Sequence, residues 1–445
     1  MQQQPRPLFY SFYLLLHFLV VIFFHTPIIP SFSLSVNRYR KLDKKSVLPY
    51  TMYMKLLIPV AAGLEQITKR QLFSLGYEHA PADNGRLELD GDWQDVARLN
   101  VCLRSGERVL ILLSRFKALT FDELYEGIYA IPWEHWLTQD SKILMDGKSV
   151  QSALAAIKAL GGVAKKAIIR RLSDKIKSGR KTFAETGARS VVGVSIFKDE
   201  VTVTLDTSGD GLHKRGYRAL AYSAPLKETL AAGLIDSTFY NPDRDEKKPF
   251  ADPFCGSGTL PIEAAMKALH IPPGLQRDFD FNAWACAPKT ALALAKEEAR
   301  AGIKQTADLQ IFASDINPEA ISIAKYHAKR AGVEKYIRFS VGDATKFKSA
   351  EKYGVLLSNP PYGERLGTEK EVQTLMRNFG NAFKKLPDWN AYILTALPDF
   401  ERYFGKRADK KKKLFNANLV CGFYSYFGKP PKSEDKESYE QKEKL

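Results

Sequence analysis

Four short polar segments in the second half of the chain have the composition of a site for a charged organic ligand. The first is FADPFCGSGTLPIEAA, in which a predicted strand leads through Gly256-Ser257-Gly258 into a predicted helix. Glycines at such a turn let the backbone approach a ligand closely, and the free N–H groups at the helix start can donate to it. The segment is neither GxGxxG nor a P-loop, and Asp252 before the glycines disfavours a pyrophosphate. It suits a zwitterion whose ammonium group lies near the acid.

Two further aspartates end the next two predicted strands. Asp315 closes IFASD and can accept hydrogen bonds from both hydroxyls of a ribose, although it lies farther from the glycines than the roughly 20 residues of a dinucleotide fold. Asp343 closes the strand of FSVGD and can accept from an adenine amino group. Either carboxylate can instead cap a turn, since Asn317-Pro318 begins a predicted helix directly after Asp315. Together with the glycine segment, the two acids predict a pocket for S-adenosylmethionine.

The fourth segment, LLSNPPYGERLG, ends an apolar strand in Asn359-Pro360-Pro361-Tyr362. Two prolines cannot continue a strand ladder, because neither has an N–H to donate. The Asn359 side-chain carbonyl and the Pro360 backbone carbonyl can both accept from an exocyclic amine, and Tyr362 can stack on its ring. Two such acceptors favour a pyramidal nitrogen and direct its lone pair at a methylsulfonium, which is catalysis by positioning and electrostatics.

Alternating strands and helices in the second half bring these segments to one edge of a predicted parallel sheet, where open α/β sheets bind ligands. The predicted strands are Pro249–Pro253, Leu309–Ser314, Ile337–Val341, Val355–Ser358 and Tyr392–Thr395. Two closing strands are predicted within Lys412–Phe427. The interval IPPGLQRDFDFNAWACAPK, Ile271–Lys289, is interpreted as an insertion that shapes the substrate mouth.

The first half predicts a smaller α+β module, which the Gly-rich basic connector Thr207–Arg218 separates from the second half. Its predicted strands are Lys55–Ala61, Arg86–Leu89, Arg108–Phe116, Ser141–Met145, Val191–Phe197 and Glu200–Asp206. Its predicted helices are Leu64–Leu75, which Gly76 should cap, Trp93–Val101 and Phe121–Ala130, with a helix-rich basic block at Ser152–Lys177.

The composition favours a polyanionic partner or an anionic membrane surface, because the 445 residues carry a net charge of +16 and a pI near 9.4. The four cysteines, Cys102, Cys255, Cys286 and Cys421, lie far apart and form no CxxC. This spacing argues against a zinc site or a disulfide framework and suits a reducing compartment. We therefore expect no metal and a cytoplasmic protein.

The chain begins with a hydrophobic extension, residues 1–53, in which Leu8–Phe24 is strongly apolar. It can be read as a signal peptide, as a membrane anchor, or as an extension irrelevant to function if translation begins at Met52 or Met54. We favour the third interpretation, so a membrane is a partner only if the segment is a real anchor. The charged tail 429–445 is predicted to be disordered.

The motifs resemble a known enzyme family. Asp-Pro-Phe-Cys-Gly-Ser-Gly-Thr with Asn-Pro-Pro-Tyr resembles class I S-adenosylmethionine-dependent amino-methyltransferases. LDTSGDGLHKRGYR, APLKETLAAGL, LSNPPYGERLG and KKKLFNANLVC narrow the resemblance to THUMP-domain RNA enzymes that methylate guanine N2 in large-subunit ribosomal RNA. The resemblance spans residue 54 to about residue 427. Many enterobacterial members carry a second methyltransferase after this module, and we expect a single activity here.

The resemblance implies a fold and a division of the chain. We expect an α/β Rossmann-like methyltransferase domain, with a mostly parallel sheet and an antiparallel last strand, preceded by an α+β ferredoxin-like and THUMP module that grips RNA. The expected bounds are 54–96 for the ferredoxin-like segment, 97–207 for the THUMP domain and 208–428 for the methyltransferase domain.

Carried over by motif, the resemblance also implies a site. Asn359, Pro360 and Tyr362 should face the target base. The residues expected at the S-adenosylmethionine site are Asp252, Pro253, Gly256, Ser257 and Gly258, with Asp315 at the ribose, Asp343 at the adenine and Pro225 at a helix start that meets the cofactor carboxylate. Cys255 is expected to pack beside the glycines and not to act as a nucleophile.

Basic residues cluster where an RNA clamp would need them. Lys158–Arg218 holds fourteen lysines and arginines against six acids, a balance of +8 that suits phosphate contacts. The expected RNA-binding residues are Lys165, Lys166, Arg170, Arg171, Lys175, Lys214, Arg215 and Arg218. GKRADKKKK, Gly405–Lys413, predicts a second phosphate contact at the catalytic mouth.

The favoured function is N2-methylation of a guanine in large-subunit ribosomal RNA, with that RNA as partner and no obligate protein partner. One alternative is an N6-adenine methyltransferase acting on DNA or RNA, because Asn-Pro-Pro-Tyr also serves that chemistry. The other is an RNA-binding ribosome assembly factor without catalysis, although intact acids at three strand ends argue against it.

Overall fold

A computed structural model describes residues 53–176, 183–220, 226–305, 307–361, 368–416 and 419–431. The hydrophobic extension before residue 53, Pro225, Tyr362 and the tail after residue 431 lie outside the described residues, as do the predictions made for them. Within the described ranges, no helix combines the length and the apolar composition needed to cross a membrane.

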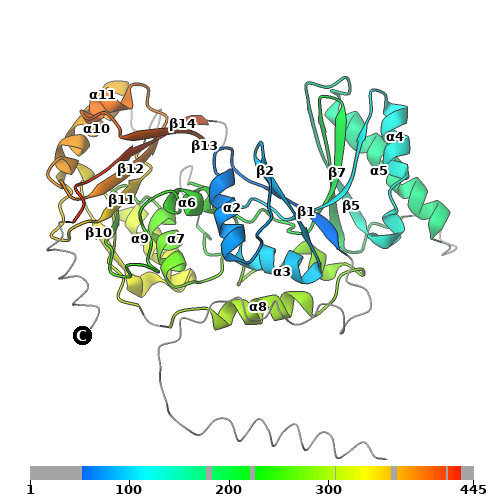
Figure 1. The fold of residues 1–445 in the computed structure, drawn as a ribbon, viewed down its shortest axis with the longest axis horizontal. Coiled ribbons are helices and arrows are strands. Elements are labelled where there is room, and N and C mark those ends of the chain that lie inside the picture. The colour runs from blue at the N-terminus through cyan, green and yellow to red at the C-terminus, as the bar shows by residue number, and fades with distance from the viewer. Residues whose placement is uncertain are drawn as a thin grey trace, which may run out of the picture. The chain divides into compact units, whose positions relative to one another are not determined.

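The first half of the chain forms one seven-stranded sheet in the order β2-β3-β1-β4-β7-β6-β5 (Figure 1). Its strands are β1 (Met54–Pro59), β2 (Ala82–Asp83), β3 (Arg86–Gly91), β4 (Leu110–Lys117), β5 (Lys142–Val150), β6 (Arg189–Phe197) and β7 (Glu200–Asp206). All neighbours are antiparallel except β5 and β6. Because β4 bonds to β1 on one side and to β7 on the other, the ferredoxin-like and THUMP segments share a single sheet.

The helices of this half begin and end where local hydrogen bonding dictates. They are α2 (Glu65–Ser74), α3 (Trp93–Cys102), α4 (Phe121–Tyr129) and α5 (Ile157–Lys175). Asp92 and Thr120 begin α3 and α4 with reciprocal capping boxes, which satisfy N–H groups that have no partner within the helix. Gly76 ends α2 as predicted: its φ is +92°, and its N–H donates to the Phe73 carbonyl at 2.9 Å.

The second half forms another seven-stranded sheet, in the order β10-β9-β8-β11-β12-β14-β13. Its strands are β8 (Phe250–Asp252), β9 (Ile311–Asp315), β10 (Ile337–Val341), β11 (Val355–Ser358), β12 (Asn390–Thr395), β13 (Lys410–Asn416) and β14 (Leu419–Tyr426). The neighbours from β10 to β12 are parallel, whereas β14 runs antiparallel to both β12 and β13. The fold class predicted from the sequence is therefore confirmed.

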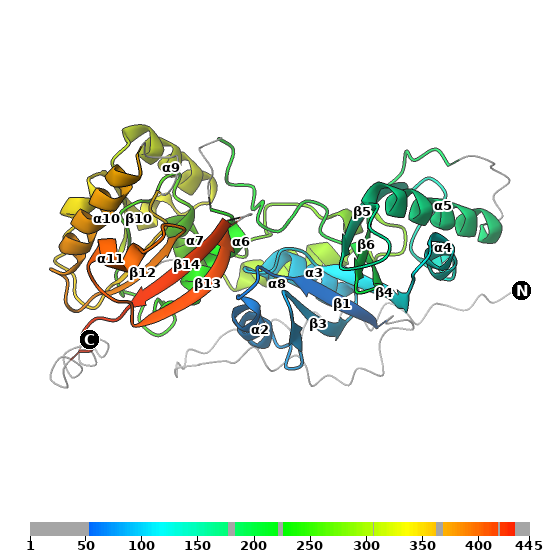
Figure 2. The ribbon, with the colours of Figure 1, turned by 90° about the horizontal axis from the view of Figure 1, so that it is seen from above.

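Helices cover both faces of the second sheet, as the views in Figure 2 make visible. They are α6 (Glu228–Ile235), α7 (Thr259–Ala268), α9 (Pro318–Arg330), α10 (Glu369–Phe383) and α11 (Phe400–Phe404). Alternate residues of β12 enter different cores: Tyr392 and Leu394 pack with α6, α7 and α9, while Ala391 and Ile393 pack with α10 and α11. This two-sided burial explains why the strands read as continuous apolar runs.

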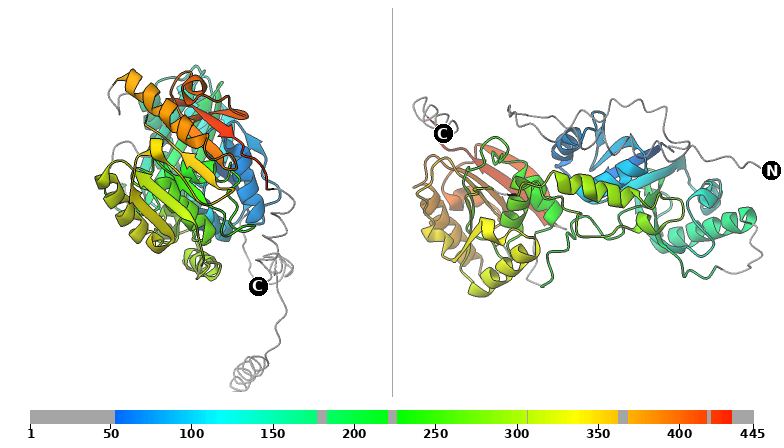
Figure 3. Two further views of the ribbon diagram at one scale, coloured as in Figure 1. Left: turned by 90° about the vertical axis from the view of Figure 1, so that its left-hand side faces the viewer. Right: turned by 90° about the horizontal axis from the view of Figure 1, so that it is seen from below.

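The predicted insertion has a different role from the one expected. Phe281 and Trp284 belong to the core of the first half, where Trp93 lies 6.2 Å and 6.3 Å from their ring centroids. The helix that follows, α8 (Ala291–Ala301), lies along α3, as Figures 1 and 3 show. The prediction that Ile271–Lys289 shapes the substrate mouth is wrong, because its aromatic residues complete the apolar core of the preceding module.

Trp284→Ala should destabilise the protein by about 3–5 kcal/mol, since the indole is only 2% exposed and would leave a large cavity. Leu294→Ala, at a position that is 52% exposed on α8, is the matched control and should change stability by no more than about 0.5 kcal/mol. Thermal unfolding followed by circular dichroism measures both. Equal midpoints for the two variants would contradict the assignment of the insertion to the core.

Candidate active site at the carboxyl edge of the second sheet

The glycine segment forms the strand–turn–helix that the sequence predicted. Gly256 and Gly258 follow β8 with φ of +51° and +86°, in the left-handed region that glycine adopts without strain. A Cβ on Gly258 would lie 3.0 Å from the Ala324 Cβ, so the turn also packs closely on α9. The N-terminus of α7 begins directly after it at Thr259. The Gly256 N–H donates to the Asp315 carboxylate and the Gly258 N–H to the Cys255 carbonyl, at 2.9 Å and 2.8 Å, so the first N–H groups of α7 are the donors suited to an anionic or hydrogen-bonding ligand.

Asp252 connects the glycine segment to the strand that carries Asn359. The carboxyl group is 2% exposed, and its Oδ1 accepts from the Ser358 hydroxyl at 2.6 Å and from the Phe254 N–H at 3.1 Å. Burial raises the pKa of Asp252 to about 7, although both hydrogen bonds act in the opposite direction. Because Ser358 immediately precedes Asn359, Asp252 fixes the ends of β8 and β11 relative to each other.

Asp315 lies at the end of β9 and braces the glycine segment. Its Oδ2 accepts from the Gly256 N–H at 2.9 Å, and its Oδ1 accepts from the Asn317 N–H at 3.0 Å. The side chain is half-buried, and each carboxylate oxygen has a second lone pair for a ligand. The structure therefore brings Asp315 and Gly256 together across neighbouring strands.

Asn359 carries a polar atom without a partner. Its side-chain Oδ1 is buried and accepts no hydrogen bond from any residue that the structure describes. Pro360, the next residue, is buried as well. Such an unsatisfied buried carbonyl costs about 1–3 kcal/mol unless a ligand donates to it.

Asp343 lies in the loop after β10 and caps a short helical turn. Its Oδ1 accepts from the N–H and the hydroxyl of Thr345 at 2.9 Å and 2.7 Å, and these bonds lower the pKa of its carboxyl. Asp343 thus caps a turn, which is the alternative that the sequence left open. A contact with a ligand would use its other carboxylate oxygen, Oδ2. Ile316, next to Asp315, is 71% exposed, an apolar surface at this edge that the sequence analysis did not single out.

Sequence reasoning also missed His327, a buried residue of α9. Its Nε2 accepts from the Leu220 N–H at 3.3 Å, so its Nδ1 carries the proton donated to the Ser257 carbonyl at 3.1 Å. Burial lowers its pKa and keeps the ring neutral. His327 thereby fixes the glycine segment against the connector, and only its regular helical spacing was visible in the sequence.

Two of the predicted RNA-binding arginines are interior residues. Arg215 is 3% exposed; it donates to the Leu212 carbonyl at 2.7 Å and lies 3.4 Å from the buried Glu263 carboxylate. Arg218 donates to the Leu226 carbonyl and to the Thr259 hydroxyl, at 2.9 Å and 2.7 Å. The prediction that Arg215 binds RNA is therefore wrong, because its guanidinium is buried and faces the domain junction. Arg218 is half-buried and orients the starts of α6 and α7.

The other predicted RNA-binding residues lie at the surface or close to it. Those on α5 are Lys165, Lys166, Arg170, Arg171 and Lys175. Arg171 forms two hydrogen bonds with Glu134, at 3.0 Å and 2.8 Å, and Lys165 forms an ion pair with Glu185 at 2.5 Å. Lys166, Arg170 and Lys175 are exposed. Lys214 is also exposed and lies 3.3 Å from Asp210.

Three sequence models of protein families match the chain in order. They are the RlmL ferredoxin-like domain over residues 55–110, the THUMP domain over residues 118–206 and the RMKL-like methyltransferase domain over residues 215–424. A Bacillus subtilis relative named "Putative RNA methyltransferase YpsC" is 41% identical over 376 residues, which are 84% of this chain and 96% of the relative. The chain belongs to this family of THUMP-containing, RlmL-like RNA methyltransferases.

Other relatives and solved structures are also described as methyltransferases or methylases. The "Ribosomal RNA large subunit methyltransferase K/L" of Psychromonas ingrahamii is 34% identical over 84% of this chain, which spans only 50% of that relative. The crystal structure of SMU.472, "a putative methyltransferase complexed with SAH", has a TM-score of 0.79 and 36% identity, with coverage of 85% and 99% of the two chains. A "predicted N6-adenine-specific DNA methylase" from Listeria monocytogenes has a TM-score of 0.79 and 42% identity, with coverage of 85% and 97%.

S-adenosylmethionine is the methyl donor of this RlmL-like family. The residues at the carboxyl edge of the sheet fit such a donor: the turn with two left-handed glycines leads into the N-terminus of α7, and the half-buried Asp315 carboxylate lies beside it. The unpartnered Asn359 carbonyl lies at the end of the adjoining strand β11. Bound there, the donor would supply an electrophilic methyl group.

Asp252→Asn should change the pH dependence of stability. The folded protein holds the Asp252 proton up to about pH 7, whereas aspartates in an unfolded chain ionise near pH 3.9. The unfolded chain therefore releases this proton before the folded protein does, so wild-type stability falls as pH rises from about 4 to about 7, and the uncharged variant escapes this loss. Melting curves without cofactor should show the variant gaining midpoint temperature relative to wild type over that interval.

Asp343→Asn is the control for this measurement. Hydrogen bonds lower the pKa of Asp343, so its stabilising contribution is fully present above about pH 5 and is lost only in more acidic solution. Its offset from wild type should stay constant between about pH 5 and pH 8. A constant offset for Asp252→Asn as well would contradict the raised pKa.

Asp315→Ala should weaken binding of S-adenosylmethionine while leaving affinity for RNA nearly unchanged. The substitution removes both the strand-end carboxylate and the brace on the Gly256 N–H. Asp308→Ala, an exposed acid before the opposite end of β9, should leave both affinities unchanged. Calorimetric titration with the cofactor and filter binding of RNA measure the two. Equal loss of both ligands by Asp315→Ala would indicate misfolding or a wrong assignment.

Proposed function

We propose that the protein transfers a methyl group from S-adenosylmethionine to the exocyclic N2 amine of a guanine in large-subunit ribosomal RNA. The observation that carries the proposal is the buried Oδ1 of Asn359 beside Pro360, for which no described residue is a hydrogen-bond partner. A site that leaves an acceptor unsatisfied in the free protein is suited to a donor that arrives with the substrate, and an aromatic amine offers two N–H donors.

In the proposed reaction, the protein positions the two reactants. The Asn359 and Pro360 carbonyls accept from the amine, which draws its nitrogen toward a pyramidal geometry and directs its lone pair at the donor methyl group. Asp252 acts as a positioning residue, because the Ser358 hydroxyl that it accepts from immediately precedes Asn359. Pro253, Ser257 and the two glycines are proposed to hold the methionine end of the cofactor, and Asp343 its adenine. Pro225 and Tyr362 keep their sequence-based assignments to cofactor carboxylate and target base.

The RNA is proposed to be held by the basic face of the THUMP half. The exposed Lys166, Arg170 and Lys175 of α5 provide phosphate contacts, together with Lys214 at the connector. Similarity to K/L enzymes of large-subunit ribosomal RNA supports this class of substrate. A ribosomal RNA substrate also supports a cytoplasmic location, as predicted from the sequence.

An N6-adenine methyltransferase is the second candidate. It is favoured by the 42% identity to the Listeria monocytogenes structure described as a "predicted N6-adenine-specific DNA methylase". An adenine amine would meet the same two acceptors, so the product has to be identified chemically. The THUMP domain favours RNA over DNA.

Asn359→Ala should keep the fold and cofactor affinity while lowering the rate of methyl transfer about 10²–10³-fold, the usual consequence of losing one preorganised polar contact. Asn378→Ala, at an exposed position of α10, is the matched control and should have wild-type activity. The assay is single-turnover transfer of labelled methyl groups to large-subunit ribosomal RNA that lacks the modification, followed by nucleoside analysis.

The labelled nucleoside separates the candidate functions. N2-methylguanosine supports the proposal, whereas N6-methyladenosine would keep the amine-orienting mechanism and replace the substrate. Near-normal turnover by Asn359→Ala would contradict the mechanism itself. Absence of any label with wild-type protein and ribosomal RNA would overturn the proposed function.

A further inference from the structure

A cavity opens at the outer strands of the second sheet. Its volume is 540 Å³, and its walls come from the residues that follow β12 and from β13 and β14. The contributing side chains include the apolar Leu397 and Val420 and the cationic Lys411 and Lys413. None of these residues has a role in the proposed methyl transfer.

The strand register puts cations and apolar groups on the same face. Lys411, Lys413 and Phe415 of β13 lie opposite Tyr424, Gly422 and Val420 of β14. Directly paired residues of an antiparallel ladder share a face, and successive residues alternate. Lys411 and Lys413 of the outermost strand therefore line the cavity, and Phe415 lies next to it on the same face, paired with the lining residue Val420, while Leu414 points to the opposite face and is buried.

Gly422 shapes the floor of the cavity. A Cβ at this position would lie 2.4 Å from the Cε2 atom of Tyr424, so the tyrosine ring occupies the space that a side chain would fill. Lys411 Nζ lies 4.7 Å from the centroid of that ring, and a hydrogen bond to Tyr424 raises the pKa of Lys411. The cavity thus has an aromatic floor with a lysine held over it.

The distance to Asn359 is short. Ser358 pairs with Ile393 of β12, and Thr395 of β12 pairs with Gly422 of β14. Neighbouring strands lie about 4.8 Å apart, so β14 and β13 lie two and three strands, or about 10–14 Å, from the strand that carries Asn359. Residues of β13 and β14 beyond the Thr395–Gly422 pair extend past the end of β12.

Several apolar side chains at this end remain exposed although they lie in strands. Phe415 is 40% exposed, Leu419 50% and Val420 52%. No ion pair is found for Lys413 among the described residues, whereas Lys411 lies 3.6 Å from Glu401. Lys413 Nζ lies 5.5 Å from the centroid of the Phe415 ring, so a cation and an exposed aromatic face are adjacent. This pair matches a ligand that has both a flat apolar face and an anion, and each nucleotide of a single strand has both.

We propose that this cavity is a subsite for a nucleotide that neighbours the target base in single-stranded RNA. Its base packs against Phe415 and Val420, and its phosphate pairs with Lys413. The subsite rests on the proposed function, since it assumes an RNA strand whose target base lies at Asn359. It holds the strand next to that base and makes the nucleotide beside the target part of substrate recognition.

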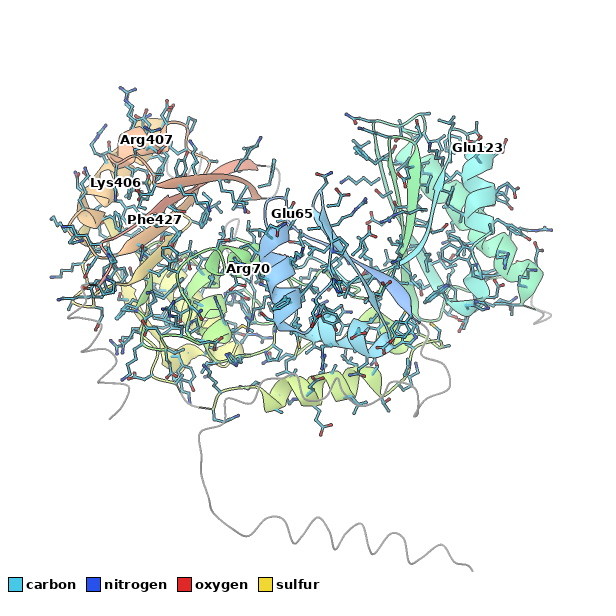
Figure 4. All side chains as sticks on the ribbon, viewed as in Figure 1. Glu65, Arg70, Glu123, Lys406, Arg407 and Phe427 are labelled. Carbon is cyan, nitrogen blue, oxygen red and sulfur yellow. The ribbon has the colours of Figure 1, made fainter. Side chains whose placement is uncertain are left out.

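Only the last part of the predicted basic segment, Gly405–Lys413, belongs to this subsite. β13 begins at Lys410, at the end of the sheet away from the carboxyl edge. Lys413 lies closer to that edge, because its partner Gly422 pairs with Thr395, the last residue of β12. Figure 4 shows Lys406 and Arg407 beside α11, before β13 begins. Lys406 Nζ lies 5.6 Å from the centroid of Tyr426. Lys406 therefore packs on the rings of Phe383 and Tyr426, whereas Arg407 is exposed.

The first test measures phosphate contact without catalysis. Affinity for an in vitro transcribed large-subunit ribosomal RNA is determined over a range of salt concentrations. Lys413→Ala should reduce the slope of log K against log salt by about 0.7, the value for one phosphate of a single strand. Lys329→Ala, an exposed lysine at the C-terminal end of α9 on the opposite edge, is the control and should keep the wild-type slope. An unchanged slope for Lys413→Ala would overturn the subsite.

The second test locates the neighbouring nucleotide. Phe415→Ala should lower single-turnover methyl transfer to the same RNA about tenfold at subsaturating RNA, with unchanged affinity for S-adenosylmethionine. Phe415→p-benzoylphenylalanine should cross-link to a nucleotide adjacent to the methylated one, and Leu294→p-benzoylphenylalanine on α8 should not. Cross-links that map far from the methylated position would contradict the proposal.

Failure of this inference is distinguishable from failure of the proposed function. If the wild-type product is N6-methyladenosine, the target base is adenine and not guanine, and the subsite is still supported when the two tests succeed. N2-methylguanosine formation with no effect of Lys413→Ala and Phe415→Ala would support the function and overturn the subsite. Wild-type protein that binds no RNA would overturn both.

Discussion

The hydrogen bond from Ser358 to the buried Asp252 carboxyl holds the site together. It joins the strand that leads into the glycine segment to the strand that leads into Asn359, at 2.6 Å and with almost no solvent access. A buried hydroxyl group without a partner would cost about 1–3 kcal/mol, so the Ser358 hydroxyl depends on the Asp252 carboxyl, which also accepts from the Phe254 N–H. This contact and the parallel pairing of β8 with β11 together fix the cofactor segment relative to the base-binding segment.

Around this contact, each neighbouring strand contributes a side chain that braces the next. Asp315 accepts from the Gly256 N–H, and His327 donates to the Ser257 carbonyl, so the glycine segment is held from two elements. The exception is Asn359, whose carbonyl remains unpartnered among the described residues. The buried Asn359 acceptor is therefore available to a donor that arrives with the proposed substrate.

The two halves of the chain are joined through charged groups that are buried at their junction. Arg104 donates to the carbonyls of Met266 and Ile271 at 2.9 Å and 2.8 Å, while Arg215 contacts Glu263 in the interior. At the surface, the exposed Arg70 of α2, labelled in Figure 4, donates from its guanidinium to the Asp236 carbonyl at 3.2 Å. Together with the aromatic contacts of Trp284, these bonds make the THUMP-bearing half and the methyltransferase half one continuous packing unit.

The sequence by itself determined the order of strands and helices, the turn at Gly256 and Gly258, and the acids and asparagine at the strand ends. These features follow from local rules: apolar periodicity, left-handed glycines and the inability of proline to extend a ladder. Only the tertiary structure decided which charges are available. Arg215 and Lys166 belong to the same basic stretch, yet one is buried against Glu263 and the other is exposed, because burial depends on residues distant in sequence. The same holds for Trp284, whose partner Trp93 lies in the other half of the chain, and for Lys413 and Val420, which share a face only through strand pairing.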